Sequence, residues 1–287
     1  MKIQDIFIAL SVPIILGFGF VIAKPAMQYF PPYLLMGMRF TIPALLLVWW
    51  FPLPKGLYLD LFKVSFIGST LQYGLTYTGL NIIDASSAVL LVQLEVPFGI
   101  IIAFFLLKEI PTIKNIIGLV IAFIGTYILT GAPNLEGKYI GVLLVLAGAF
   151  TWSLGAVMAK PLSKKIGAYA LMTWLAVFSG PMLFFISALI NGNPIPYFLS
   201  ANLNSWLTVL FLGFIMQPVG YASWYYVLRK YPVNKVMPVL LLLPVTGLIT
   251  SIFLLGEDPP KQVFLGGFVI IFGVALILFT KKNKKYE

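Results

Sequence analysis

The sequence contains no cysteine and no histidine among its 287 residues. Disulfide bonds are therefore excluded. The usual soft metal ligands are missing as well, as is the side chain that most readily carries a proton near neutral pH. From this composition we expect neither a metal site nor a cofactor.

Charge is also scarce, since charged residues make up only 10% of the chain, whereas apolar residues make up 60%. Apolar stretches of about 20 residues, the length that crosses a bilayer as a helix, recur throughout and leave no room for a soluble domain. The first stretch lacks the small-residue cleavage site of a signal peptide, so we expect it to be retained. No stretch matches G-x-x-x-x-G-K-[ST], so ATP is not expected to drive this chain. The sequence therefore predicts an all-α integral membrane protein.

Turn residues, prolines and charges divide the chain into ten predicted transmembrane helices. They cover residues 5–26, 33–51, 60–80, 84–107, 112–130, 138–161, 168–190, 203–228, 234–255 and 262–280. An even number puts both termini on one side, and the lysine-rich tail at 281–287 assigns that side to the cytoplasm. Fifteen of the 19 Lys and Arg residues then face the cytoplasm and three face the other side, with Arg39 inside a helix. The net charge of +10 is thus explained by topology and by anionic lipids, and not by nucleic-acid binding.

The two halves of the chain resemble each other at three collinear places. These are "GFVIAKP" at 19–25 with "GAVMAKP" at 155–161, "FIGSTLQ" at 66–72 with "FLGFIMQ" at 211–217, and "LLKEIPTIKNIIGLVIAFIG" at 106–125 with "LLGEDPPKQVFLGGFVIIFG" at 254–273. The last match pairs Gly118 with Gly266 and Gly125 with Gly273. Three matches in the same order indicate an internal duplication.

Each copy holds five predicted helices, so the second copy must enter the membrane upside down relative to the first. We therefore predict two inverted five-helix repeats, residues 5–130 and 138–280, followed by a basic cytoplasmic tail at 281–287. Inverted repeats are typical of transporters that expose a central site alternately to the two sides of a membrane.

Several motifs resemble a known family: "FPPYLLMGMRF" at 30–40, "VGYASWYYVLRKYPVNKVMPVLLLLPVTGL" at 219–248 and "QVFLGG" at 262–267. Over essentially its full length the chain resembles the drug/metabolite transporter superfamily, in particular its EamA group. It is similar to the branch that exports O-acetylserine and cysteine. The resemblance implies transport of amino acids and related small metabolites, usually outward and without ATP, across a bacterial inner membrane. One departure is Glu95, where the family usually has a neutral residue.

Glu95 is an acid in the middle of an apolar run. It lies about eleven residues, or roughly 16 Å, into the predicted helix 84–107, which is close to the bilayer centre. An ionised carboxylate there costs about 2.5 to 3.5 kcal/mol, so it must face a cavity, find a partner or take up a proton. We expect Glu95 to bind a substrate ammonium group or to carry a proton. A structural ion pair with Arg39 or Lys24 is the alternative.

Other polar and aromatic side chains within the spans are further candidates for substrate binding. Arg39 could hold a substrate carboxylate through two hydrogen bonds, or it could cap a neighbouring helix end. Gln72 and Gln93 are predicted to line a cavity, because an amide both donates and accepts. Tyr73 and Trp152 are the aromatic residues that we expect to reach the substrate.

The remaining polar groups receive structural predictions. Gln217, the repeat mate of Gln72, could satisfy a backbone carbonyl freed by Pro218. Lys24 and Lys160 are repeat mates that we expect to extend their side chains to water. Glu109 and its mate Glu257 are predicted to stabilise helix N-termini.

These observations predict a secondary exporter of small amino acids or related amine metabolites that works by alternating access. The alternative is a proton-coupled carrier of organic cations or quaternary amines. An intramembrane enzyme is disfavoured, because paired carboxylates or a Ser/His arrangement are missing from the predicted midplane. The expected partners are a small-molecule substrate and membrane lipids, and a homodimer is left open.

Overall fold

The computed structural model describes residues 1–80, 82–83, 91–130, 137–255 and 261–279, and these residues form helices joined by short connections. The first half contains α1 (Ile3–Ala26), α2 (Pro32–Leu47), η1 (Val48–Trp50), α3 (Tyr58–Ser65), η2 (Phe66–Leu71), α4 (Gln72–Leu80), α6 (Glu95–Leu107) and α7 (Ile113–Thr130). The second half contains α8 (Tyr139–Ile166), α9 (Ala168–Asn191), α10 (Ile195–Ser200), α11 (Leu203–Phe211), η3 (Leu212–Tyr221), α12 (Ala222–Lys230), α13 (Val233–Val236), η4 (Met237–Leu242), α14 (Leu243–Leu255) and α15 (Lys261–Leu278).

Six helical segments of the described chain are long and apolar enough to cross a membrane. They are Ile3–Ala26, Pro32–Trp50, Tyr139–Ile166, Ala168–Asn191, Leu203–Lys230 and Val233–Leu254. Three further apolar helices are shorter: Glu95–Leu107, Ile113–Leu129 and Phe264–Leu278. Large apolar side chains on the outside, such as Leu199 at 82% and Phe253 at 84% exposure, suit contact with lipid. The all-helical membrane class is confirmed, and the count of ten spans stays a prediction.

The prediction of one continuous helix over 84–107 is wrong in its described part. Residues 93–94 form a turn, and α6 begins at Glu95. Pro97 explains the break, because proline has no N–H to donate and is tolerated in the first turn of a helix but not in its interior. Glu95 therefore lies in the first turn of a helix and not in the middle of one. The positive end of the helix dipole at this terminus would favour the ionised form of a carboxyl group, in opposition to the cost of burial.

Two equivalent helices share an irregular turn. The π-helical segment η2 follows α3 in the first half, and the π-helical segment η3 follows α11 in the second. These segments cover all but one residue of each matched sequence, "FIGSTLQ" at 66–72 and "FLGFIMQ" at 211–217. The equivalence predicted from the sequence thus extends to an unusual backbone geometry, which in helices is frequently found at functional sites.

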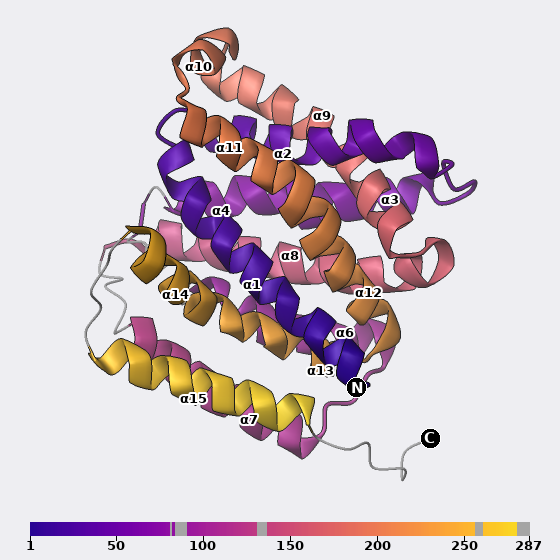
Figure 1. Cartoon of the computed structure of the whole chain (residues 1–287). Coiled ribbons are helices and arrows are strands. Elements are labelled where there is room, and N and C mark those ends of the chain that lie inside the picture. The colour runs from indigo at the N-terminus through magenta and orange to yellow at the C-terminus, as the bar shows by residue number, and fades with distance from the viewer. Residues whose placement is uncertain (81, 84–90, 131–136, 256–260, 280–287) are drawn as a thin grey trace.

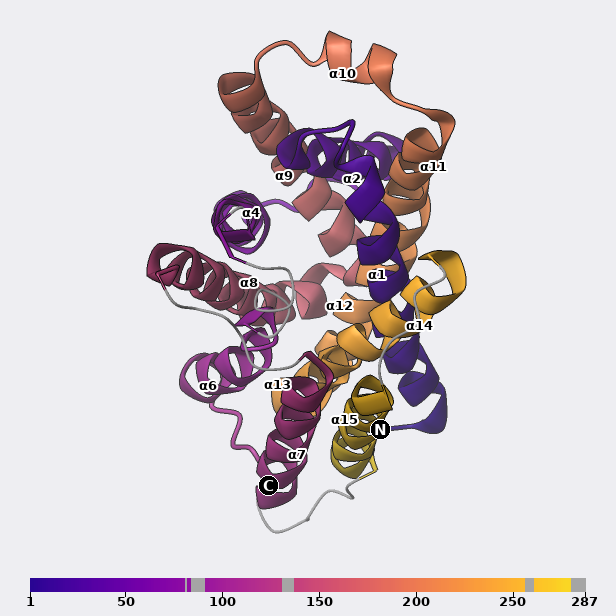
Figure 2. The same ribbon diagram turned by 90° about the vertical axis from the view of Figure 1, so that its left-hand side faces the viewer.

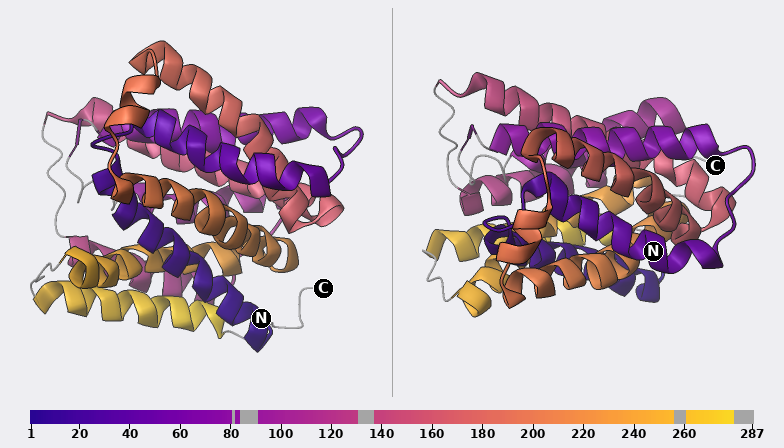
Figure 3. Two further views of the ribbon diagram at one scale, coloured as in Figure 1. Left: turned by 45° about the horizontal axis from the view of Figure 1, so that its top comes forward. Right: turned by 90° about the horizontal axis from the view of Figure 1, so that it is seen from above.

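The first helix of each half packs against helices of the other half. The first helix of the chain, α1, lies between α11 and α14 of the second half (Figures 1 and 3). In the same way α8, the first helix of the second half, contacts α4 and α6 of the first half. Helices α2 and α9 pack together on one side of the bundle, and α10 lies beyond them as a short connection (Figure 2).

On the opposite side, α7 and α15 lie along each other (Figures 1 and 2). Their contact uses glycines whose backbones approach closely. A Cβ placed on Gly118 would lie 2.7 Å from the carbonyl oxygen of Gly273, and one on Gly125 would lie 2.9 Å from that of Gly266. In the sequence repeat Gly118 is equivalent to Gly266, and Gly125 to Gly273. Exchanging the two halves therefore turns one of these contacts into the other. The two helices therefore run antiparallel along a self-matching surface.

Candidate functional site

A cavity lies where helices of both halves cross. Its wall contains six aromatic residues, Phe40, Tyr73, Trp152, Tyr221, Trp224 and Tyr225, and seven others, Val64, Gly68, Ser69, Gly155, Ala156, Leu175 and Gln217. Space exists here because η2 and α8 meet through glycines, and a Cβ on Gly155 would lie 2.3 Å from the Cα of Gly68. Backbones at such a crossing approach closely and leave no side chains to fill the space beside them. The wall combines these aromatic rings with polar groups, among them Ser69, Gln217 and the hydroxyl of Tyr73.

Arg39 lies directly behind this wall and is only 1% exposed. Its Nε and Nη2 both donate to Oε1 of Gln217 at 3.1 Å, and its Nη1 donates to the hydroxyl oxygen of Tyr73 at 2.7 Å. The guanidinium also lies 4.9 Å from the ring centroid of Tyr221, within the range of a cation–π interaction. No acid forms an ion pair with Arg39 among the described residues. Its charge is therefore balanced only by neutral groups.

Arg39 determines whether the neighbouring polar groups of the cavity wall present hydrogen-bond donors or acceptors to the cavity. A guanidinium can only donate, so Gln217 and Tyr73 must both present an oxygen to it. The amide NH₂ group of Gln217, which has no hydrogen-bond partner among the described residues, and the hydroxyl hydrogen of Tyr73 are then left to donate elsewhere. The wall thus offers hydrogen-bond donors in front of a buried positive charge. That arrangement suits an anionic group such as a carboxylate.

The structure brings together only part of the predicted site. Tyr73 and Trp152 form part of the wall, and Arg39 contacts it from behind. Gln72 and Gln93 are absent from the described lining. The Nε2 of Gln72 donates to Thr76 at 3.2 Å, and the Oε1 atoms of both amides are buried without a hydrogen-bond partner in the described chain.

Glu95 is buried, at 6% exposure, but is not among the described wall residues. Its predicted structural pair is not formed, because no ion pair joins Glu95 to Arg39, and Lys24 is exposed at the surface. The Oγ of Ser153, next to Trp152, donates to the backbone carbonyl of Glu95 at 2.6 Å. The backbone of Glu95 is therefore bound to α8, which forms part of the wall, while its side chain is not among the described residues that line the cavity.

Gln217 and Tyr221 were not predicted as substrate-contacting residues. Gln217 does not satisfy a freed carbonyl, as its position before Pro218 suggested, but accepts two hydrogen bonds from Arg39. A signal was present in the sequence, because Gln217 is the repeat mate of Gln72. Its partner could not be found from spacing, since the two residues are 178 positions apart.

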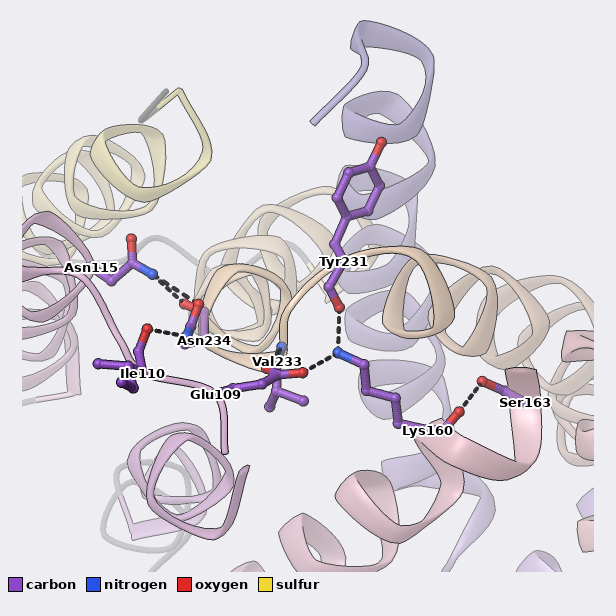
Figure 4. A network of polar contacts seen from close by, with 8 residues as sticks. All are labelled: Glu109, Ile110, Asn115, Lys160, Ser163, Tyr231, Val233 and Asn234. Atoms are coloured by element: carbon purple, nitrogen blue, oxygen red, sulfur yellow. Dashed lines mark hydrogen bonds and ion pairs between the residues drawn. The ribbon is translucent and has the colours of Figure 1, made fainter. Parts of the chain in front are cut away.

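The prediction that Lys160 extends to water is wrong. Lys160 is 5% exposed, and its Nζ donates to Glu109 at 2.5 Å and to the backbone oxygen of Tyr231 at 2.6 Å (Figure 4). Glu109 stabilises a helix N-terminus, as predicted. The helix is not the one that follows Glu109 in the sequence, however, but α13, because Glu109 accepts a hydrogen bond from the N–H of Val233. Its predicted mate Glu257 lies outside the described residues.

In the part of the chain that the structure describes, no three His, Cys, Asp or Glu side chains come together as a metal site. The site is instead a membrane-embedded aromatic cavity between two matched sets of helices, as in a multi-pass transporter of small molecules. A family model matches the chain twice, at residues 4–131 and 139–279. The chain belongs to the EamA-like transporter family, which confirms the resemblance seen in the motifs.

Two curated relatives cover nearly the whole chain. A "probable amino-acid metabolite efflux pump" of Salmonella typhimurium is 28% identical over 97% of this chain and 96% of the relative. A protein of the same description in Escherichia coli is 28% identical over 99% of this chain and 98% of the relative. A solved crystal structure matches with a TM-score of 0.80 at 17% identity, over 96% of this chain and 98% of that one. That structural likeness supports the fold alone.

Proposed function

We propose that this protein exports small amino acids or related metabolites across a bacterial inner membrane by alternating access, without ATP and with both termini in the cytoplasm. The two relatives described as amino-acid metabolite efflux pumps support the direction and the substrate class. The observation that carries the proposal is the buried guanidinium of Arg39, which is bound only by neutral groups of the cavity wall.

The contacts between the halves support an inverted pair of repeats, 5–130 and 138–280. Helix α1 packs on the second half in the way that its equivalent, α8, packs on the first half. The glycine contacts between α7 and α15 likewise form an equivalent pair. Both sets of contacts therefore stay the same when the two halves are exchanged. Such a two-fold relation in the membrane plane allows the same helices to open on one side and close on the other.

In the proposed mode of binding, the substrate carboxylate lies against the donors of Gln217 and Tyr73. Arg39 stabilises the carboxylate from behind, because it holds the oxygens of Gln217 and Tyr73 and so leaves their donors toward the cavity. The Trp152 and Trp224 rings, 5.8 Å apart between centroids, form an apolar wall for the rest of the molecule. A permanently charged amine without a carboxylate is disfavoured by the positive charge behind the wall.

We retain Glu95 as the proposed acidic group of the transport cycle. A buried carboxyl group with no ion-pair partner among the described residues must take up a proton or a substrate ammonium group. The hydrogen bond from Ser153 on α8 to the backbone carbonyl of Glu95 joins the start of α6 to a helix that forms part of the cavity wall. The alternative function, proton-coupled transport of organic cations, depends on this same residue.

The test is uptake of radiolabelled substrates into proteoliposomes of the purified protein, with and without a pH gradient. Neutral amino acids such as cysteine and O-acetylserine are compared with their carboxamide analogues, which lack the carboxylate. We expect movement of the acids and little movement of the carboxamides. Transport restricted to quaternary amines, and only under a pH gradient, would contradict the proposal and favour the alternative.

A further inference from the structure

A second group of buried polar contacts surrounds residues 231–234, which are the two-residue connection after α12 and the first two residues of α13 (Figure 4). The backbone oxygen of Tyr231 accepts from Lys160, and the N–H of Val233 donates to Glu109. Asn115 Nδ2 donates at 3.1 Å to both the backbone oxygen and the Oδ1 of Asn234. We call Glu109, Lys160, Asn115 and the Tyr231–Asn234 segment the gate network. It ties together three helices and the segment after α6.

The gate network lies at the end of the bundle that carries the N-terminus. The hydroxyl of Tyr231 accepts from the backbone N–H of Lys2 at 3.0 Å and donates to Asp5 at 2.5 Å. The first turn of α1 is thereby joined to the same connection. Opening this end of the protein requires all of these contacts to separate from the Tyr231–Asn234 segment.

The network begins just beyond the cavity wall. Lys160 follows the wall residue Ala156 by four positions on α8, which is about 6 Å along a helix, and Tyr231 follows Trp224 by seven, about 10 Å. Near the network, α6 also packs on η4, where a Cβ on Gly99 would lie 2.3 Å from Cε of Met237, three residues after Asn234. The helices that the network holds together are therefore those that would have to part to open the cavity toward this face.

The repeat mate of Lys160 has different surroundings. Lys160 is buried and paired, whereas Lys24 is exposed at the surface and makes no ion pair with a described residue. An inverted-repeat transporter needs such a difference between equivalent residues. In each conformation of the cycle, the contacts that close one membrane face are formed while the equivalent contacts at the other face are broken.

The chemistry of the network suits a contact that breaks and re-forms as a unit. Removing one member of a buried ion pair leaves the other charge without compensation, whereas separating the two into water hydrates both. Partial opening is therefore disfavoured relative to full closure or full opening. The glycine contact between α7 and α15 has no such groups at its crossing points and can stay packed throughout.

We propose that the gate network closes the cavity toward the membrane face that carries the N-terminus, and that each transport cycle opens and re-forms it. The proposal rests on the proposed function only in taking the cavity as the substrate path. It assigns Glu109 and Lys160 to conformational control and not to substrate contact.

The absence of cysteine permits a direct test. A single reporter, Ser69→Cys, is placed in the cavity wall and labelled with a membrane-impermeant maleimide in sealed vesicles of both orientations. We expect Glu109→Gln and Lys160→Met to increase labelling from the N-terminal face by about tenfold relative to the reporter alone. Lys24→Met, the matched control at the repeat mate, should leave labelling from that face unchanged.

Unchanged labelling in both variants, with melting temperatures close to that of the parent, would overturn the proposal. An increase of equal size in Lys24→Met would overturn it as well, because the effect would then not be specific to the network. If the ion-pair variants do not fold, Asn115→Ala leaves the ion pair intact and removes the two amide bonds to Asn234 together with the local bond from Thr112, and a smaller increase from the same face is expected. Labelling needs no substrate, so failure to transport amino acids would count against the proposed function and not against the gate.

Discussion

Gln72 and Gln217 occupy equivalent positions in the two halves, each at a π-helical turn, yet only Gln217 is bound to a charge. Gln217 accepts two hydrogen bonds from Arg39, whereas Gln72 donates one to a threonine of its own helix. Lys160 and Lys24 differ in the same way, one buried in an ion pair and one exposed. The repeat thus supplies a symmetric backbone, and substitutions on one copy create a polar site and a closed end.

The largest effect on this difference between the two halves is expected from removing Arg39. Arg39→Gln should abolish amino-acid flux in proteoliposomes, because the wall loses its buried charge. Two acceptors, on Gln217 and Tyr73, also lose their donor, and each unsatisfied group costs about 1–3 kcal/mol. Melting of the purified protein should therefore fall as well. Arg39→Lys keeps the charge but not the fork, so its flux should be intermediate. Wild-type flux in Arg39→Gln would exclude a role in binding.

The two glutamines give a matched pair. Gln217→Leu leaves Arg39 without its bidentate acceptor, and a lost hydrogen bond to a charged group is worth about 1.5–3 kcal/mol, or roughly ten- to a hundredfold in flux. Gln72→Leu removes only a bond to Thr76 and should change flux by less than about threefold. Equal losses in the two variants, measured as initial uptake rates, would show that the halves contribute equally.

Glu95 tests a second difference between the halves. Continuing the alignment of 106–125 with 254–273 back along the chain places Glu95 opposite Leu243, an apolar residue. Glu95→Gln keeps the shape but cannot release a proton, so flux should fall by about tenfold or more and lose its response to a pH gradient. Melting should stay near that of the parent, because a neutral amide is cheaper to bury than a carboxylate. A variant with normal, gradient-sensitive flux would restrict Glu95 to its helix N-terminus.

The smallest effect concerns packing at two equivalent crossings. A Cβ on Gly155 would meet the backbone of Gly68, which cannot move aside, whereas one on Gly19 would meet the Sδ of Met216 at 2.5 Å. A methionine side chain is flexible and can change rotamer. Gly155→Ala should therefore destabilise the protein by about 1–3 kcal/mol and Gly19→Ala by less. Thermal melting in detergent compares them, and a larger loss for Gly19→Ala would contradict this reading of the two crossings.

The sequence predicted those features that depend on local pattern. Apolar runs gave the helices, and the matched segments gave the equivalence that η2 and η3 share in their backbone. The start of α6 at Glu95 was missed, because the apolar residues on both sides of Gln93 and Glu95 were taken as one helix although Pro97 interrupts its hydrogen bonds.

Side-chain partners from distant parts of the chain could not be predicted. The surface role expected for Lys160 followed from its place near a helix end, and only the folded chain brings Glu109 and Tyr231 to it. Arg39 was recognised as a candidate, but its contacts with Gln217 and Tyr73 require two helices from different halves to pack together. Spacing along one helix carries no information about such pairs.

The crossed glycines of α7 and α15 have a consequence for how such a protein could arise. Each half carries one copy of a stripe that fits the reversed copy of itself, with Gly118 on Gly273 and Gly125 on Gly266. A gene of half this length would therefore already encode a five-helix protein with a surface for dimerisation. Through that surface one copy would bind a second copy that is inserted in the membrane in the opposite orientation. Joining two such genes end to end preserves that fit and requires no new interface to evolve.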